Sequence, residues 1–195
     1  MKIPLYFIYL FYTLALAFIM LVIVPRKRIY ELALLGIFYG AIIDVFWILV
    51  IGLIHAGGYL NYGPLGFLGI PFMPPIAWTV FFIMFLYFLP DRKPWNYLFA
   101  VVSAGYGVFF SNVLSNLGIF EWTFSKVILP FGLYLTWFFF VTWSYLKQGK
   151  RFVRYVVRKK NFVRSKSRYY YPVQREESSL KPSAKHPKKP LKIKR

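Results

Sequence analysis

The chain of 195 residues contains no cysteine, only two histidines and only six acidic residues. Without cysteine there are no disulfide bonds, no thiolate metal ligands and no thiol nucleophiles. His55 and His186 fall in segments predicted to lie on opposite sides of a membrane, and no acidic cluster suited to Mg²⁺ occurs. Glycine-rich phosphate loops and serine elbows are also missing from the sequence. The sequence therefore predicts no metal site and no cofactor, and it disfavours an enzyme.

Basic residues, in contrast, are abundant and unevenly distributed. The 25 lysines and arginines give a formal net charge of +19, while 58% of the residues are hydrophobic and 23% are aromatic. Residues 1–146 hold seven basic and four acidic residues, whereas residues 147–195 hold eighteen and two. The first part is too apolar for a soluble domain and the second is too basic for a packed core. This composition indicates an integral membrane protein with a cationic C-terminal tail.

Five apolar runs account for residues 1–146. A helix needs about 20 mostly apolar residues to cross a hydrocarbon core of about 30 Å. Proline damages a helix interior but is tolerated in the first turn and beyond the end, and no proline falls in the middle of a run. We predict an all-α, polytopic transmembrane helix bundle with spans at about 3–24, 32–54, 70–89, 97–117 and 127–146, the third being complete only if residues 70–75 belong to it.

The N-terminal run has an alternative interpretation. Ala15-Leu16-Ala17 has the small-x-small pattern of a signal-peptide cleavage site. The apolar run continues to Val24, however, and only Lys2 precedes it, which favours a retained first span.

The distribution of lysine and arginine predicts the orientation. Basic residues in short flanking loops mark the cytoplasmic side. Residues 25–31, 90–93 and the tail carry 23 of them, and the alternate segments carry only Lys2 and Lys126. We therefore expect a multi-pass protein of the cell (inner or plasma) membrane, with its N-terminus outside and its C-terminus in the cytoplasm.

The connection between the second and third runs is unusually apolar. Residues 55–71 contain five glycines and no lysine or acidic residue. Irregular backbone is tolerated at membrane depth where protein shields it from lipid. Two interpretations remain open for residues 55–75: a segment that lies at the interface or dips into the protein, or a flexible hairpin.

Asp44 is the most informative polar residue. It lies twelve residues into the second run, about 18 Å from the inner end at 1.5 Å per residue. An aspartate at a helix centre costs about 2.5–3.5 kcal/mol on insertion scales. Gly36 and Gly40 precede it at intervals of four residues, and small residues permit close helix packing. Asp44 should therefore face another helix and not lipid.

The fourth run offers a matching polar face, because Ser103, Gly107, Ser111 and Ser115 are also spaced by four. Our hypothesis is that spans two and four pack together and that Asp44 forms a hydrogen bond with Asn112 or Ser111. His55, eleven residues beyond Asp44, would cap an outward-facing polar path. Asp44 then has either a purely structural role or a role in transport, proton or ligand binding. The candidate intramembrane polar site comprises Asp44, Asn112, Ser111, Ser115, Asn116 and His55.

Residues 147–168 interleave basic with apolar and aromatic side chains, which is typical of an amphipathic helix on an anionic membrane surface. Residues 169–195, rich in Ser, Lys and Pro, are expected to be disordered. Binding of the tail to nucleic acid is the alternative, but lipid is the nearer polyanion. The candidate lipid-binding residues are Arg151, Arg154, Arg158, Lys159, Lys160 and Arg164.

The layout of residues 1–146 resembles an uncharacterised group of small polytopic membrane proteins from spore-forming Gram-positive bacteria. The features concerned are a first span that ends in Pro25-Arg26-Lys27-Arg28, Gly40 and Asp44 in the second span, and four or five aromatic-rich spans. The resemblance implies a membrane location but no activity, and the long basic tail departs from it.

The predicted function is a non-enzymatic accessory or scaffold protein that holds its tail against anionic lipid and acts through a protein partner or as a homo-oligomer. A small transporter or channel subunit that uses Asp44 and Asn112 is the alternative. A membrane enzyme ranks third.

Overall fold

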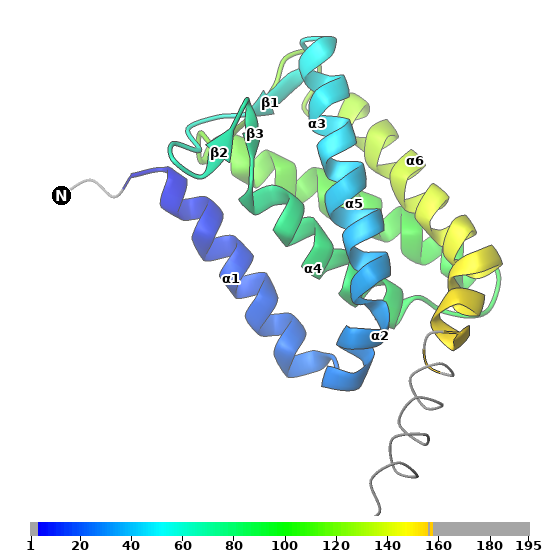
Figure 1. Ribbon diagram of the computed structural model, residues 1–195. Helices are drawn as coiled ribbons and strands as arrows, with labels where there is room; N and C mark the ends of the chain where they lie inside the picture. The colour runs from blue at the N-terminus through cyan, green and yellow to red at the C-terminus, as the bar shows by residue number, and fades with distance from the viewer. Residues whose placement is uncertain (1–3, 156, 158–195) are drawn as a thin grey trace, which may run out of the picture. The chain divides into compact units, whose positions relative to one another are not determined.

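The computed structural model describes residues 4–155 and residue 157. It is mainly helical, and the five apolar runs each form a helix in the predicted order (Figure 1). Within the described residues, four helices are long and apolar enough to cross a membrane, as in an integral membrane protein. These are α1 (Tyr6–Ile23), the continuous helix Arg26–Leu53, α5 (Trp95–Asn116) and the continuous helix Ile128–Tyr155.

The second long helix is built from α2 (Arg26–Gly36), the π-helical segment η1 (Ile37–Ile42) and α3 (Ile43–Leu53). It begins six residues before the predicted residue 32, directly after Pro25. The charged residues 26–28 lie outside the second apolar run but form the first turn of its helix, because lysine and arginine are good helix formers. The last helix likewise continues past the predicted residue 146, through α6 (Ile128–Ser144) and the π-helical segment η2 (Tyr145–Gly149).

The short helix α4 (Met73–Phe88) is packed most tightly between the others, and half of its 16 residues are buried. The helices α1, α2 and η1 all pack against it. Gly40 touches its backbone so closely that an added Cβ would lie 2.6 Å from the Cα atom of Thr79. The small-residue face of the second helix therefore faces another helix, as expected, but that helix is α4.

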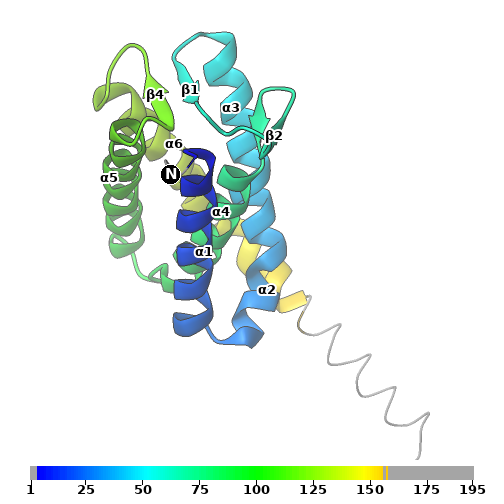
Figure 2. The same cartoon turned by 90° about the vertical axis from the view of Figure 1, so that its left-hand side faces the viewer.

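The predicted packing of the second span against the fourth is wrong, because α5 packs most extensively against α6. The small face of α5 receives a ring there: a Cβ on Gly107 would lie 3.1 Å from Tyr134. Figure 2 shows α5 on one side of α1 and the helix formed by α2 and α3 on the other. Spacing by four residues thus identified both contact faces but not which helices they contact.

Large aromatic side chains fill the space between α4 and α6. The ring centroids of Trp78 and Trp137 lie 4.8 Å apart, and those of Phe82 and Phe138 lie 5.2 Å apart. Such pairs bury large apolar areas in tilted or offset geometries. They make this layer the aromatic centre of the bundle.

The connections at one end of the bundle form four short strands, which the all-α prediction missed. β1 (Gly57–Tyr59) pairs antiparallel with β4 (Phe120–Trp122), and β2 (Gly66–Phe67) pairs antiparallel with β3 (Ile70–Pro71). The third helix consequently begins at Met73 and not at residue 70. Gly57 is required in β1, since a Cβ there would lie 2.1 Å from the carbonyl oxygen of Glu121.

Tyr9 of α1 joins these connections to the bundle. Its side chain is fully buried, and its hydroxyl contacts the backbone carbonyl oxygens of Leu60, at 2.5 Å, and Ile119. The segment 55–71 is thus tied down at β1, while Phe67 and Leu68 at the β2–β3 turn stay largely exposed. The two interpretations of residues 55–75, an interfacial or inward-dipping segment and a flexible hairpin, stay predictions.

Candidate functional site

Asp44 lies in the first turn of α3, directly after the π-helical segment η1, and is only 4% exposed. It is about 27 Å along the helix from Arg26 and about 14 Å from Leu53, at 1.5 Å per residue. Because the helix begins earlier than predicted, Asp44 lies about 7 Å from the middle of the helix, on the side of the strand-bearing end. The confirmed part of the prediction is that Asp44 is buried within the protein.

A cavity of about 30 Å³ lies beside Asp44, between α3, α6, β1 and β4. A space of about 10–15 Å³ measured in this way is enough for a water molecule, so the cavity accommodates a small polar guest. Its wall is largely aromatic, and the residues used below are Asp44, Trp47, Tyr59, Trp122, Tyr134 and Trp137.

Two polar atoms of residues that line this cavity lack a hydrogen-bond partner. Among the described residues, the buried side-chain atoms without one are Asp44 Oδ2, Trp47 Nε1, Asn96 Nδ2 and Thr142 Oγ1. Only Asp44 and Trp47 belong to the same cavity. Most buried polar side chains in proteins are satisfied, so a pair of unsatisfied groups beside one cavity needs an explanation.

Asn112 and Ser111 do not satisfy Asp44. The side-chain amide of Asn112 donates to the carbonyl oxygens of Val108, at 2.9 Å, and Lys126, at 2.8 Å. These bonds hold the α5–α6 connection against the end of α5. The predicted hydrogen bond between Asp44 and Asn112 or Ser111 is therefore wrong in this structure, because α5 is not the neighbour of α3.

Ser111 accepts a hydrogen bond of 3.2 Å from the indole N–H of Trp122 and donates to the carbonyl oxygen of Val108. It lines a second cavity of about 30 Å³. Tyr59 and Tyr134 line both cavities. Ser111 and Asp44 thus line two different cavities that share part of their walls.

The remaining members of the predicted polar site lie elsewhere. Ser115 is half-buried and Asn116 is exposed at the end of α5, and His55 is exposed just beyond α3. Within the described part of the chain, none of the three lines the cavity beside Asp44. The structure does not bring them together with Asp44, so His55 forms no cap over it.

Sequence reasoning missed the aromatic residues around Asp44, above all Tyr59, Trp122, Tyr134 and Trp137. Their abundance was visible in the sequence, but nothing in their spacing linked them to α3. Tyr59 belongs to β1, outside the helices, and burial raises the pKa of its phenol well above the ordinary value because desolvation disfavours phenolate. Tyr59 therefore faces the cavity as a neutral group.

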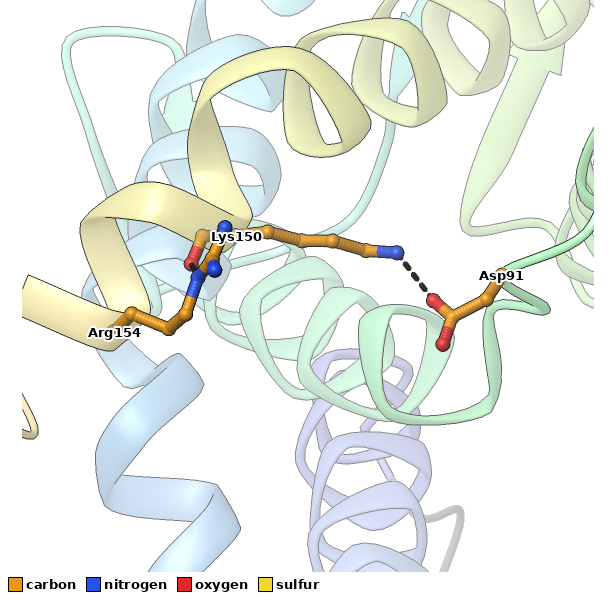
Figure 3. A network of polar contacts seen from close by, with 3 residues as sticks. All are labelled: Asp91, Lys150 and Arg154. Carbon is orange, nitrogen blue, oxygen red and sulfur yellow. Dashed lines mark hydrogen bonds and ion pairs between the residues drawn. The ribbon is translucent and has the colours of Figure 1, made fainter.

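A second feature is the concentration of basic residues at the end opposite the strands. The α1–α2 junction, the α4–α5 junction and the extension of α6 lie at this end (Figure 1). Lys150 on the extension forms an ion pair with Asp91 of the α4–α5 junction, as Figure 3 shows. Nε of Arg154 donates to the carbonyl oxygen of Lys150 at 3.3 Å.

Of the candidate lipid-binding residues, Arg151 and Arg154 are exposed on the helical extension. The apolar side of that extension packs back on the bundle, where Val153 is only 9% exposed and belongs to the core. Arg158, Lys159, Lys160 and Arg164, and with them most of the predicted segment 147–168 and all of 169–195, lie outside the described residues.

Comparison of the chain with known protein families, with curated proteins and with solved structures finds no match. The cavity beside Asp44 and the basic end are therefore the features of the chain that bear on its function.

Proposed function

We propose that the protein is a five-span, non-enzymatic accessory or scaffold protein of the cell membrane, with its N-terminus outside and its basic end in the cytoplasm. It acts there through a protein partner or as a homo-oligomer. The observation that carries the proposal is the charge distribution: nine of the ten basic residues in the described part of the chain lie at one end, and Lys126 alone lies at the other.

The acidic residues at the basic end neutralise little of this charge. Glu31 pairs with Arg28 at 3.0 Å, and Asp91 pairs with Lys150. Nine basic and two acidic residues leave a net charge of +7 at this end. Each basic residue near an anionic leaflet contributes about 1 kcal/mol of attraction, which favours the cytoplasmic surface for this end and for the tail that follows it.

The five-span topology requires α4 to cross the membrane. Its 16 residues extend about 24 Å, less than the hydrocarbon core of about 30 Å. Local thinning of the bilayer accommodates such a mismatch at modest cost. Neighbouring helices also cover half of α4, which reduces its exposure to lipid.

The lipid contact is tested with a nitroxide label on a cysteine at Arg154, a unique site because the chain has no cysteine. In vesicles that contain anionic lipid we expect this label to be shielded from a water-soluble relaxing agent, and high salt should reverse the shielding. A label at the exposed Thr123, at the other end, is the control. Equal accessibility in neutral and anionic vesicles would contradict the proposal.

Binding of RNA by the tail is the competing outcome. The full-length protein in neutral-lipid nanodiscs should lose RNA at physiological salt, because such contacts weaken steeply with salt. RNA binding that persists there, with no response to anionic lipid, would replace lipid by RNA as the ligand of the tail.

A small transporter or channel subunit is the second candidate function. The unpartnered carboxyl oxygen of Asp44 at a cavity favours it, since ionisable groups inside membrane helices commonly mark solute or proton paths. Five spans are few for a complete transporter, so this function requires an oligomer. Solute uptake into proteoliposomes that is lost in Asp44→Asn would support it, whereas uptake unchanged by Asp44→Asn would contradict it.

A further inference from the structure

We propose that the cavity beside Asp44 is a binding site for a small cation of the ammonium class, namely ammonium or a primary alkylammonium as small as methylammonium. This inference rests on the second candidate function, the transporter or channel subunit, only in taking the cavity beside Asp44 as the site. The titration proposed below would detect binding without transport, so failure of the binding site can be told apart from failure of the transport function.

The carboxyl group of Asp44 has no counter-charge within the part of the chain that the structure describes. An ionised carboxylate at 4% exposure carries a large desolvation cost unless a counter-charge lies beside it. The ion pairs among the described residues, Arg28–Glu31 and Lys150–Asp91, both lie at the basic end. A bound cation would supply the missing charge, taking the place of the proton on the neutral carboxyl group.

The aromatic wall of the cavity also favours an ammonium cation. Trp47, Tyr59, Trp122, Tyr134 and Trp137 line the cavity together with Asp44. Aromatic faces attract cations through their quadrupole, most strongly where water is excluded. An ammonium ion uses such faces while an N–H group donates to Asp44. Potassium instead needs several oxygen ligands, as in a channel filter, and this wall offers mostly ring carbon.

The volume of the cavity favours a small cation. The cavity measures about 30 Å³ on the scale on which about 10–15 Å³ holds one water molecule, so it has room for roughly two or three non-hydrogen atoms. Ammonium is close to water in size, and methylammonium adds one methyl group. A quaternary ammonium ion such as choline is too large for the space as it stands. The site thus has an aromatic wall that suits a cation, and it has room only for a small one.

The indole N–H of Trp47, which also lines the cavity, does not bond to Asp44 in this structure. It is buried without an acceptor, one helical turn beyond Asp44. An N–H donor repels a cation, but it stabilises a carboxylate, which has four lone-pair positions to share. Binding of a cation to ionised Asp44 leaves acceptor capacity for this donor.

The test is titration of the full-length protein in nanodiscs with ammonium, methylammonium, choline and potassium chlorides at constant ionic strength, with tryptophan emission as the readout. Trp47, Trp122 and Trp137 line the cavity, so a guest should change their emission. We expect saturable responses to ammonium and methylammonium, and affinities at least about tenfold weaker in Asp44→Asn. Asp91→Asn, at the exposed ion pair, is the matched control and should bind like the wild type.

Asp44→Glu is the second variant, because it keeps the charge and fills the cavity with one more methylene group. It should retain ammonium and lose methylammonium, which a variant that failed to fold would not do. The proposal is overturned if the wild type shows no saturable response, if Asp44→Asn binds equally well, or if potassium competes as strongly as methylammonium. A pH response that depends on Asp44 without any ammonium response also overturns it and leaves a proton site.

Discussion

The indole N–H of Trp137 on α6 donates a hydrogen bond of 2.9 Å to the backbone carbonyl oxygen of Tyr39 in η1. The hydroxyl of Tyr39 in turn lies 2.8 Å from Oγ of Ser144, also on α6. Tyr39 of the π-helical segment is thus held to α6 at two points. Since η1 leads directly into the turn that carries Asp44, these two contacts fix the position of Asp44 relative to the α6 wall of the cavity.

Trp137→Phe should lower the free energy of unfolding by about 1–3 kcal/mol, because it keeps an aromatic ring but leaves a buried carbonyl oxygen without this donor. Denaturant titration of the purified protein in detergent measures the change. Trp143→Phe is the control, since Trp143 is 51% exposed and should have little effect. Equal stability of the two variants would contradict a role for the bond between Trp137 and Tyr39.

Gly40→Ala should destabilise the bundle by about 1–3 kcal/mol, since its new methyl group would lie 2.6 Å from backbone atoms of Thr79 in α4, where no side chain can move aside. Gly52→Ala, further along the same continuous helix, is the matched control. A Cβ at Gly52 has no neighbour within 4 Å, so alanine should be neutral or stabilise the helix by up to about 1 kcal/mol.

Thermal unfolding of both glycine variants in the same detergent decides the question. Gly40→Ala should unfold at a lower temperature than the wild type and Gly52→Ala should not. If both variants keep the wild-type midpoint, the close packing of the second helix on α4 is not present in the folded protein.

The sequence predicted the five helices well because their apolar runs are bounded by prolines and charges such as Pro25, Arg26 and Pro90. Helix ends were less accurate, since Arg26 ends an apolar run while beginning a helix. The four strands escaped prediction because each has only two or three residues, and the pairing of β1 with β4 joins segments about 60 residues apart. Only the folded chain shows that Gly57 lies against Glu121.

For the candidate site, too, the sequence pattern did not show which segments come together. A buried acidic residue on a small-residue face was predictable from Gly36, Gly40 and Asp44. Its neighbours were not, because the spacing of Ser103, Gly107 and Ser111 indicates a contact face without naming the helix that fills it. Tyr134, on α6, occupies that face and also lines the cavity of Asp44.

Tyr9→Phe should loosen the strand-bearing end without unfolding the helices. The hydroxyl of Tyr9 contacts the carbonyl oxygens of Leu60 and Ile119, and phenylalanine leaves both without that donor at an expected cost of about 1–3 kcal/mol. Hydrogen exchange of residues 57–60 and 119–122 should accelerate, while exchange in α4 should not. Tyr155→Phe, at a residue that is 63% exposed at the other end of the bundle, is the control. Unchanged exchange at both connections in Tyr9→Phe would contradict this role.

The ion pair between Asp91 and Lys150 should contribute little stability. The Asp91 side chain is 80% exposed, and pairs in water are worth about 0–1 kcal/mol. A double-mutant cycle with Asp91→Asn and Lys150→Gln should give a coupling energy within that range, smaller at high salt. A coupling that exceeded it and resisted salt would indicate a buried pair that holds the α6 extension to the α4–α5 junction.

The proposed orientation predicts which introduced cysteines a membrane-impermeant reagent reaches. Arg92→Cys lies in the α4–α5 junction at the basic end, and Thr123→Cys lies just after β4 at the other end. Both positions are exposed, and the absence of native cysteine leaves each introduced thiol as the only target. In intact cells Thr123→Cys should react and Arg92→Cys should react only after permeabilisation, because basic loops stay in the cytoplasm.

Inverted vesicles should reverse this pattern, which excludes a simple difference in reactivity between the two thiols.

The same pair of sites also tests whether the short helix α4 crosses the membrane. If α4 did not cross the membrane, residues on either side of it would share a compartment, and Phe67→Cys, at the exposed β2–β3 turn, would then be labelled together with Arg92→Cys. Labelling of Phe67→Cys together with Thr123→Cys, and apart from Arg92→Cys, requires α4 to cross despite its length of 16 residues.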